Sequence, residues 1–295
     1  MPVEEFIINV FCLIDDLYNT VVTRPLRSRG TPPKLSDSEV IAMELAGEWL
    51  GHHTDKAIYE YFKKHWMQLF PKLPHRTQFV RQAANLWAVK QQLHQHLVKV
   101  LGADTADIHL VDGFPMEVCV KTRANRSKVF NGLASYGYCA SKKQSFYGLH
   151  GHLLTDARGV PVGITVTAAN VDERDSIYEL LEGIQGLMIG DKGYIRPELK
   201  QDCESFGIDL QTPLRKNMKD KRPKWIVRQL MNVRRRIETV IGQLASYFEL
   251  ERVRARDDWH LTSRVARKLL GITVGIYLNI QSGHEPIQFE AMLSA

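Results

Sequence analysis

The sequence predicts an all-α segment followed by an α/β domain built on a mixed sheet. Residues 1–103 carry apolar side chains at helical spacing. After Gly102 the pattern changes to short apolar runs separated by turn-forming residues, which is typical of strands. Helical stretches lie between and after these runs, and strands covered by helices define an α/β architecture. We therefore predict a helical domain over residues 1–103, an α/β domain over 104–281 and a tail over 282–295.

Length and composition indicate a globular protein outside the membrane. The 295 residues, 44% of them hydrophobic, are enough for one large domain or two ordinary ones. The longest apolar stretches, such as residues 269–280, are shorter than the roughly 20 residues that a membrane-spanning helix needs. The first residues lack the basic start of a signal peptide. We expect a cytoplasmic protein.

The four cysteines predict neither a zinc knuckle nor a disulfide framework. Cys12, Cys119, Cys139 and Cys203 are scattered along the chain, and none of them forms a C-x-x-C pair. We interpret them as reduced thiols, in keeping with the cytoplasm.

Four helices are predicted in the first domain. The first carries an apolar stripe from Phe6 to Leu17. Ser36 and Glu39 have the spacing of a capping box that opens the second, and Thr54 is placed to cap the third. Residues 77–101 predict a longer fourth helix. Such a bundle is compatible with a helix-turn-helix that reads DNA and equally with a packing unit that has no DNA role.

Short apolar runs predict the strands of the second domain. Residues 148–155 and 161–167 alternate around a turn at 156–159 and indicate a hairpin. The other predicted elements are strands at 108–112, 186–191 and 207–212, and helices at 175–184 and 224–250. No internal repeat interrupts this pattern, so one α/β domain accounts for it.

Positive charge is concentrated in one segment. The net charge is +6, and between Arg215 and Arg236 ten Lys or Arg residues stand against the single acid Asp220. A solvated helix face normally mixes both signs, so this segment favours contact with a polyanion such as the phosphates of DNA. Smaller basic clusters lie at residues 121–143 and 252–268.

Three carboxylates are candidates for a catalytic metal site. Asp112 and Asp191 each follow an apolar run and precede turn-forming residues, which places both at strand ends, where α/β sheets commonly assemble sites. Glu238 lies at the edge of the apolar stripe of the 224–250 helix. Three acids are enough to hold two Mg²⁺ ions, which activate water and neutralise charge during phosphodiester cleavage. The alternative is that the aspartates are turn residues and that Glu238 pairs with Arg234 on the surface.

Several motifs occur in the order found in bacterial insertion-sequence transposases. The motifs are Asp112-Gly-Phe-Pro115 with Cys119 and Arg123 behind it, then Lys142, Lys143, Tyr147, Gly148 and His150, then Ala169-Asn-Val-Asp-Glu-Arg174, then Gly190-Asp-Lys-Gly-Tyr194, and finally Arg234-Arg-Arg-Ile-Glu238. Together they resemble the insertion sequence 982 family, over roughly residues 105–280.

The resemblance implies a ribonuclease H-like catalytic domain in which Asp112, Asp191 and Glu238 are the DDE metal ligands. They would come from the first strand, the fourth strand and the following helix. It also implies two bound Mg²⁺ or Mn²⁺ ions, terminal inverted repeats and target DNA as substrates, and a homodimer in the bacterial nucleoid. We expect the helical domain to help recognise the DNA ends.

One signature of related transposases is only partly present. Arg234 matches the arginine of the pattern Tyr-x-x-Arg-x-x-x-Glu-x-x-x-x-x-x-Lys. Met231 stands where the tyrosine would be, and Ala245 where the lysine would be. The nearby residues that are candidates to replace their contacts with DNA are Arg235, Arg236 and Gln243.

Ten basic residues are predicted to contact DNA. They are Lys192, Arg215, Lys216, Lys219, Lys221, Arg222, Lys224, Arg228, Arg234 and Arg235. Lys192 fits an exposed turn lysine equally well. Trp225, inside the basic run, is interpreted as a core residue and Asn170 as a helix cap. His150 and His152 share one face of a strand, and we interpret them as packing or hydrogen-bonding residues rather than metal ligands.

The sequence thus predicts a DNA transposase. Water would attack a DNA phosphate first, and the freed 3′-hydroxyl would then attack target DNA at the same centre. Two alternatives stay open, namely a metal-dependent nuclease of the same fold that never joins strands, and a non-catalytic DNA-binding protein derived from it.

Overall fold

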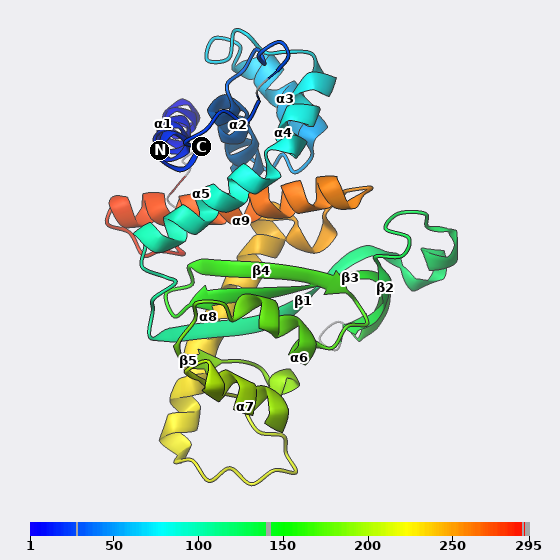
Figure 1. Cartoon of the computed structure of the whole chain (residues 1–295), viewed down its shortest axis with the longest axis vertical. Helices are drawn as coiled ribbons and strands as arrows, with labels where there is room; N and C mark the ends of the chain where they lie inside the picture. The colour runs from blue at the N-terminus through cyan, green and yellow to red at the C-terminus, as the bar shows by residue number, and fades with distance from the viewer. Residues whose placement is uncertain (28, 140–142, 291, 293–295) are drawn as a thin grey trace. The chain divides into compact units, whose positions relative to one another are not determined.

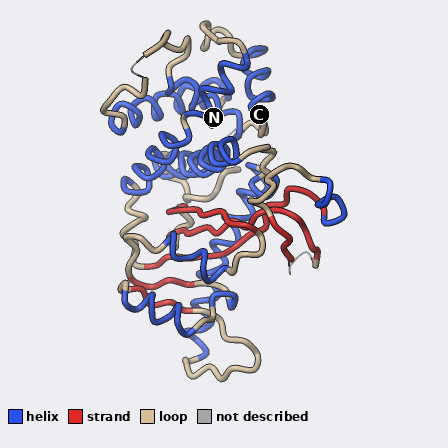
Figure 2. The backbone as a smooth tube through the Cα atoms, turned by 45° about the vertical axis from the view of Figure 1, so that its right-hand side comes forward, coloured by secondary structure: helices blue, strands red, loops and turns tan. Residues whose placement is uncertain are grey.

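A computed structural model describes residues 1–27, 29–139, 143–290 and 292. Lys142, one of the motif residues, lies outside them. The chain forms two compact units, one made of residues 1–97 and 246–295 and the other of residues 98–245. The first consists of helices and loops, whereas the strands belong to the second (Figure 2). The units therefore divide the chain differently from the predicted domains, because residues 246–281 join the N-terminal helices.

Among the described residues, the first unit contains six α-helices of ten residues or more. They are α1 (Val3–Val21), α2 (Asp37–Trp49), α3 (Asp55–His65), α4 (Arg76–Asn85), α5 (Trp87–Val100) and α9 (Asp258–Gln281). The capping box of Ser36 and Glu39 and the cap by Thr54 are both confirmed. The single helix predicted over 77–101 is wrong, since α4 ends at Asn85 and α5 begins at Trp87. An apolar stripe continues through the break, so periodicity alone does not reveal it.

Helix α2 is the centre of this unit and is buried on all sides. It carries Glu44 and Glu48 inward, and these acids pair with Arg267 and Lys268 of α9. The Arg267 guanidinium also lies 2.7 Å from Asp55 of α3. Removing one partner of such a buried pair is costly, because it leaves an uncompensated charge. These ion pairs explain why α9 belongs with the N-terminal helices.

The second unit contains a curled mixed sheet, which confirms the predicted α/β class. Its described strands are β1 (Ile108–Val120), β2 (Ser135–Cys139), β3 (Gln144–Asp156), β4 (Pro161–Ala168), β5 (Gly186–Ile189) and β6 (Ile208–Gln211). The order is β2-β3-β1-β5-β6, with β4 also paired to β3. Strand β3 is antiparallel to its neighbours, while β5 and β6 run parallel to β1.

Helices cover this sheet on both faces. Helix α8 (Lys224–Phe248) passes behind the sheet in Figure 1, while α6 (Glu173–Ser176) and α7 (Pro197–Ser205) lie in front. The helix predicted over 175–184 is replaced by α6 and a 3₁₀ turn, η2 (Ile177–Leu180). Strand β2 was not predicted, and β1 extends eight residues beyond Asp112, so Asp112 lies within a strand instead of at its end.

None of the helices among the described residues is long and apolar enough to cross a lipid bilayer.

Candidate active site

The register of β1 and β5 brings Asp112 and Asp191 together. The parallel pair aligns Leu110 with Ile189, and each aspartate lies two residues further along its chain. Because parallel strands run in the same direction, both carboxylates lie beyond the paired residues on the same side. Asp112 and Asp191 interact electrostatically. The sequence prediction that these acids meet thus agrees with their positions.

Asp112 sits in a largely buried position. Its carboxylate accepts a hydrogen bond from the Gly113 amide at 2.9 Å and lies 3.1 Å from the Arg234 guanidinium. Burial raises the pKa of Asp112 to about 6, an effect that Arg234 opposes and that the charges of Asp191 and Glu238 reinforce. A carboxyl whose pKa is raised by burial and by like charge is typical of a functional site.

Glu238 reaches this centre from α8 through Arg234. Ile237 and Val240 bury the apolar face of the helix, and Glu238 lies next to that face with 50% of its side chain exposed. The Arg234 guanidinium donates a hydrogen bond to Glu238 at 2.5 Å and another to Asp112. The pairing of Glu238 with Arg234, which the alternative interpretation expected, is present. It links Glu238 to Asp112 instead of separating them.

A fourth acid, Glu173, lies at the same centre and was not predicted as a site residue. It is the first residue of α6, which follows β4 after a short turn. Burial, reinforced by the charges of Asp112 and Asp191, raises the pKa of Glu173 to about 7. The Nε2 atom of His150 lies 3.6 Å from the Glu173 carboxylate. Only the motif spanning residues 169–174 pointed to this region, and it did not single out the glutamate.

The histidines and Asn170 also take definite positions. The His152 side chain is fully buried, and both of its ring nitrogens are without a hydrogen-bond partner among the described residues. Its ring centroid is 4.6 Å from that of His150. Asn170 accepts a hydrogen bond from Ser135, whereas Asp172 caps α6, so the predicted cap role of Asn170 is wrong.

Most of the predicted DNA-binding residues are at least partly exposed on the loop before α8 and on α8 itself. Those with exposed side chains are Lys192, Arg215, Lys216, Lys219, Lys221, Lys224, Arg228 and Arg235. Arg222 instead binds Asp220, Gln211 and the Thr212 carbonyl, and Arg234 binds the two acids. Hydrogen bonds within the chain therefore occupy these two arginines.

The environment of Trp225 differs from the prediction. Its side chain is 65% exposed instead of buried, because it stands outside the apolar stripe that starts with Ile226. An exposed tryptophan within a basic segment is suited to stacking on an unpaired base. Two members of the 252–268 basic cluster, Arg267 and Lys268, are buried in ion pairs and so do not form a phosphate-binding surface.

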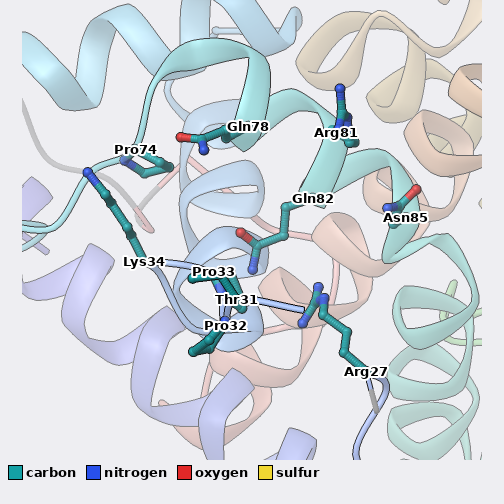
Figure 3. A pocket seen from close by; sticks show the side chains of 10 residues that line it. All are labelled: Arg27, Thr31, Pro32, Pro33, Lys34, Pro74, Gln78, Arg81, Gln82 and Asn85. Carbon is teal, nitrogen blue, oxygen red and sulfur yellow. The ribbon is translucent and has the colours of Figure 1, made fainter. Parts of the chain in front are cut away.

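The helical unit carries a second candidate site beside α4. A cavity of about 300 Å³ is lined by Gln78, Arg81 and Asn85 of α4 and by Arg27 and Lys34 from the loop before α2 (Figure 3). Arg27 is held by a bidentate pair with Asp37. Arg81 and Lys34 are exposed. The cavity wall is therefore cationic and amide-rich, a composition that suits DNA.

Comparisons with known proteins identify the family to which the chain belongs. No curated protein matches the sequence. The fold is similar to the cryo-EM structure of the piggyBac transposase synaptic complex with hairpin DNA. That match has a TM-score of 0.50 and 8% identity over 94% of this chain and 74% of that chain. A family described as the transposase DDE domain matches residues 102–258, which is more than half of the chain. The protein therefore belongs to the transposase DDE domain family.

Proposed function

We propose that this transposase binds the terminal inverted repeats of its own element and cuts and joins DNA at Asp112, Asp191 and Glu238. The observation that carries the proposal is the convergence of these acids. Asp112 lies in β1, Asp191 follows the parallel strand β5, and Glu238 is linked to Asp112 by Arg234. The similarity in fold to the piggyBac transposase supports the same proposal.

The donor set fits a hard divalent cation. Among the described side chains, no three His, Cys, Asp or Glu residues form a ready-made metal cage. Mg²⁺ is commonly held by one or two carboxylates, with waters and substrate phosphates completing its shell, so a full cage is not required. Asp112, Asp191 and Glu238 would hold Mg²⁺ or Mn²⁺. The proposed number of ions is two. When bound, the metal supplies an activated nucleophile and neutralises phosphate charge.

The chain's own residues orient the substrate and the acids. The Arg234 guanidinium fixes the carboxylates of Asp112 and Glu238 through its planar fork of donors. The exposed lysines between Lys216 and Lys224 would contact the DNA backbone, whose phosphates dominate affinity. The exposed indole of Trp225 would stack on a base that is unpaired near the cut.

The strand order also supports a ribonuclease H-like fold. The order β4-β3-β1-β5-β6 has one antiparallel strand beside β1 and two parallel strands on its other side, with the acid-bearing helix α8 following β6. We further propose membership of the insertion sequence 982 family in a bacterial nucleoid, on the ordered motifs. We also propose a homodimer, because cutting and joining act on paired ends.

Recognition of the ends is assigned to α4 in the helical unit. Gln78, Arg81 and Asn85 lie one to two turns apart and are exposed, so they share one face. Arg, Gln and Asn are the side chains that read base edges in the major groove. Replacing Arg81 with Ala should lower the preference for element-end over random DNA in a competition binding assay. An unchanged preference would remove α4 from this role.

One assay separates the three candidate functions. Purified protein is incubated with labelled element-end DNA, a target plasmid and Mg²⁺ or Mn²⁺. A transposase releases 3′-hydroxyl ends and joins them to the plasmid. A nuclease of the same fold gives cut ends without joined product, and a non-catalytic binder gives a complex with intact DNA. Absence of joined product under every metal condition would contradict the proposal.

A further inference from the structure

Glu173 lies beside the proposed catalytic acids, but the assignment of Asp112, Asp191 and Glu238 gives it no role. Glu173 comes from α6, on the opposite face of the sheet from α8, which carries Glu238. Its side chain is 34% exposed, and the charges of Asp112 and Asp191 act on it. A partly buried carboxylate beside other carboxylates destabilises a protein unless a cation compensates their charge.

Two glycines make room for this carboxylate. A Cβ atom built on Gly193 would clash with Glu173 Oε2, and one built on Gly113 would lie 3.2 Å from Oε1. Each glycine stands within two residues of a catalytic aspartate in sequence. Gly113 follows Asp112, and Gly193 follows Asp191 by two positions. The backbone that presents the aspartates is therefore shaped to admit Glu173 between them.

Ion pairs and hydrogen bonds of neighbouring residues hold the helix that carries Glu173. Arg196, which follows the Asp191 segment, lies 3.4 Å from Asp172 and is hydrogen-bonded to Asp175, so it bridges the residues on either side of Glu173. Asp172 additionally caps α6 through the Arg174 amide. These contacts hold α6, and with it the backbone of Glu173, against the segment that carries Asp191.

A buried hydroxyl faces the same acids. Tyr194 is 1% exposed, and its hydroxyl oxygen has no hydrogen-bond partner in the part of the chain that the structure describes. Burial raises its pKa, and the charges of Glu173, Asp112 and Asp191 add to the rise, so the hydroxyl lies within their field. A buried polar group without a partner is rare and commonly marks a place for a water molecule or an ion.

We propose that Glu173 is a further metal ligand of this centre, which binds a divalent cation such as Mg²⁺ or Mn²⁺ together with Asp112 and Asp191. The inference rests on the proposed function, because it assumes that the two aspartates bind metal. The Tyr194 hydroxyl would donate a hydrogen bond to a carboxylate or a metal-bound water. Three carboxylates from β1, α6 and the segment after β5 then surround the cation.

Calorimetric titration of Mn²⁺ into the full-length protein without DNA tests this assignment. Glu173→Gln should weaken Mn²⁺ binding at least about tenfold, as expected when a ligand is removed. The matched control Glu182→Gln replaces an exposed acid a short distance along the chain and should change binding less than about twofold. Asp112→Asn and Asp191→Asn are titrated in parallel.

The parallel variants separate the two ideas. Wild-type binding by Glu173→Gln with weakened binding by both aspartate variants overturns the role of Glu173 and leaves the proposed function intact. Wild-type binding by both aspartate variants contradicts the proposed metal site itself. If only Glu173→Gln lost Mn²⁺ binding, the proposal that Glu173 shares a cation with the two aspartates would be overturned.

Folding is controlled by two further measurements. In chelator, Glu173→Gln should melt at or above the wild-type temperature, because it removes a repelling charge; a clearly lower melting temperature would assign Glu173 a structural role and overturn the proposal. Gly193→Ala keeps every carboxylate but displaces Glu173, and it should weaken Mn²⁺ binding. Gly242→Ala, whose added Cβ meets nothing within 4 Å, is its control. Equal Mn²⁺ binding by both glycine variants would overturn the proposal.

Discussion

The guanidinium of Arg234 lies 3.1 Å from the carboxylate of Asp112, although 122 positions separate the two residues in the chain. The same guanidinium also binds Glu238, one helical turn further along α8. Arg234 is thus the only basic side chain that the structure's described salt bridges place on these acids. Its planar fork links β1 to α8, which otherwise share no ion pair among the described residues.

Replacing Arg234 should damage catalysis more than DNA binding. Arg234→Gln leaves Asp112 and Glu238 without the donor that orients them, so we expect DNA cleavage to fall by about 10- to 100-fold. Affinity for element-end DNA, measured by fluorescence anisotropy, should change about as much as in Arg236→Gln, which removes the same charge from an exposed position on the helix. Equal cleavage by the two variants would show that Arg234 does not orient the acids.

The contribution of Asp112 and Glu173 to stability without metal should fall as pH rises. The pKa of Glu173 is raised from 4.5 to about 7 and that of Asp112 from 3.8 to about 6. In the folded protein these two carboxyls keep protons that they have already released in the unfolded chain, so their contribution to the free energy of unfolding decreases between about pH 4 and pH 7. Above pH 7 this contribution is fully lost.

Urea unfolding in chelator at pH 5 and pH 8 checks this dependence. The double variant Asp112→Asn, Glu173→Gln should gain stability relative to wild type at pH 8 and much less at pH 5. A difference between variant and wild type that is the same at both pH values would mean that these carboxyls titrate normally in the folded protein.

The basic loop should set the salt dependence of DNA binding. Lys216, Lys219, Lys221 and Lys224 are exposed. Replacing all four with Gln should reduce the slope of log affinity against log salt by about 0.9 for each phosphate that the loop no longer neutralises. The control replaces four exposed lysines of the helical unit, namely Lys56, Lys63, Lys64 and Lys72, with the same change in net charge. A wild-type slope in the variant that lacks Lys216, Lys219, Lys221 and Lys224 would exclude these lysines from the DNA interface.

Breaking a buried ion pair of the helical unit should cost more stability than breaking an exposed one. Arg267→Met removes the buried guanidinium that pairs with Glu48 and Asp55, although Lys268 and Arg264 still pair with these acids. We therefore expect a loss of about 3 kcal/mol in the free energy of unfolding. Arg254→Met is the control, because Arg254 is 68% exposed and its pair with Glu249 should contribute less than about 1 kcal/mol. Similar losses for both variants in denaturant unfolding would argue against this account.

The sequence predicted those elements whose signals are local. The capping box at Ser36 depends on residues three positions apart, and the hairpin of β3 and β4 depends on alternation beside a turn. The apolar runs before Asp112 and Asp191 correspond to β1 and β5, which pair in parallel. Asp112 was expected at a strand end, but β1 continues past it because its partner β3 pairs as far as Val120.

Features that depend on distant contacts were missed. The pairing of α9 with α2 arises from Arg267 and Glu48, which lie more than two hundred positions apart, and the basic residues of α9 looked like a DNA surface instead. Glu173 had no local mark, because its importance comes from two glycines on other elements that leave space for its carboxylate. A tryptophan at the start of an amphipathic helix is commonly buried, but Trp225 lies outside the apolar stripe and is therefore exposed.

The central claim is tested most directly by DNA cleavage with Asp112→Asn, Asp191→Asn and Glu238→Gln beside wild type, using element-end DNA and Mn²⁺. Each substitution removes a charge and keeps the side-chain shape. We expect every variant to bind the DNA with near wild-type affinity and to cleave it at least about 100-fold more slowly. Cleavage at the wild-type rate by any one variant would contradict the assignment of that residue, and by all three would contradict the site.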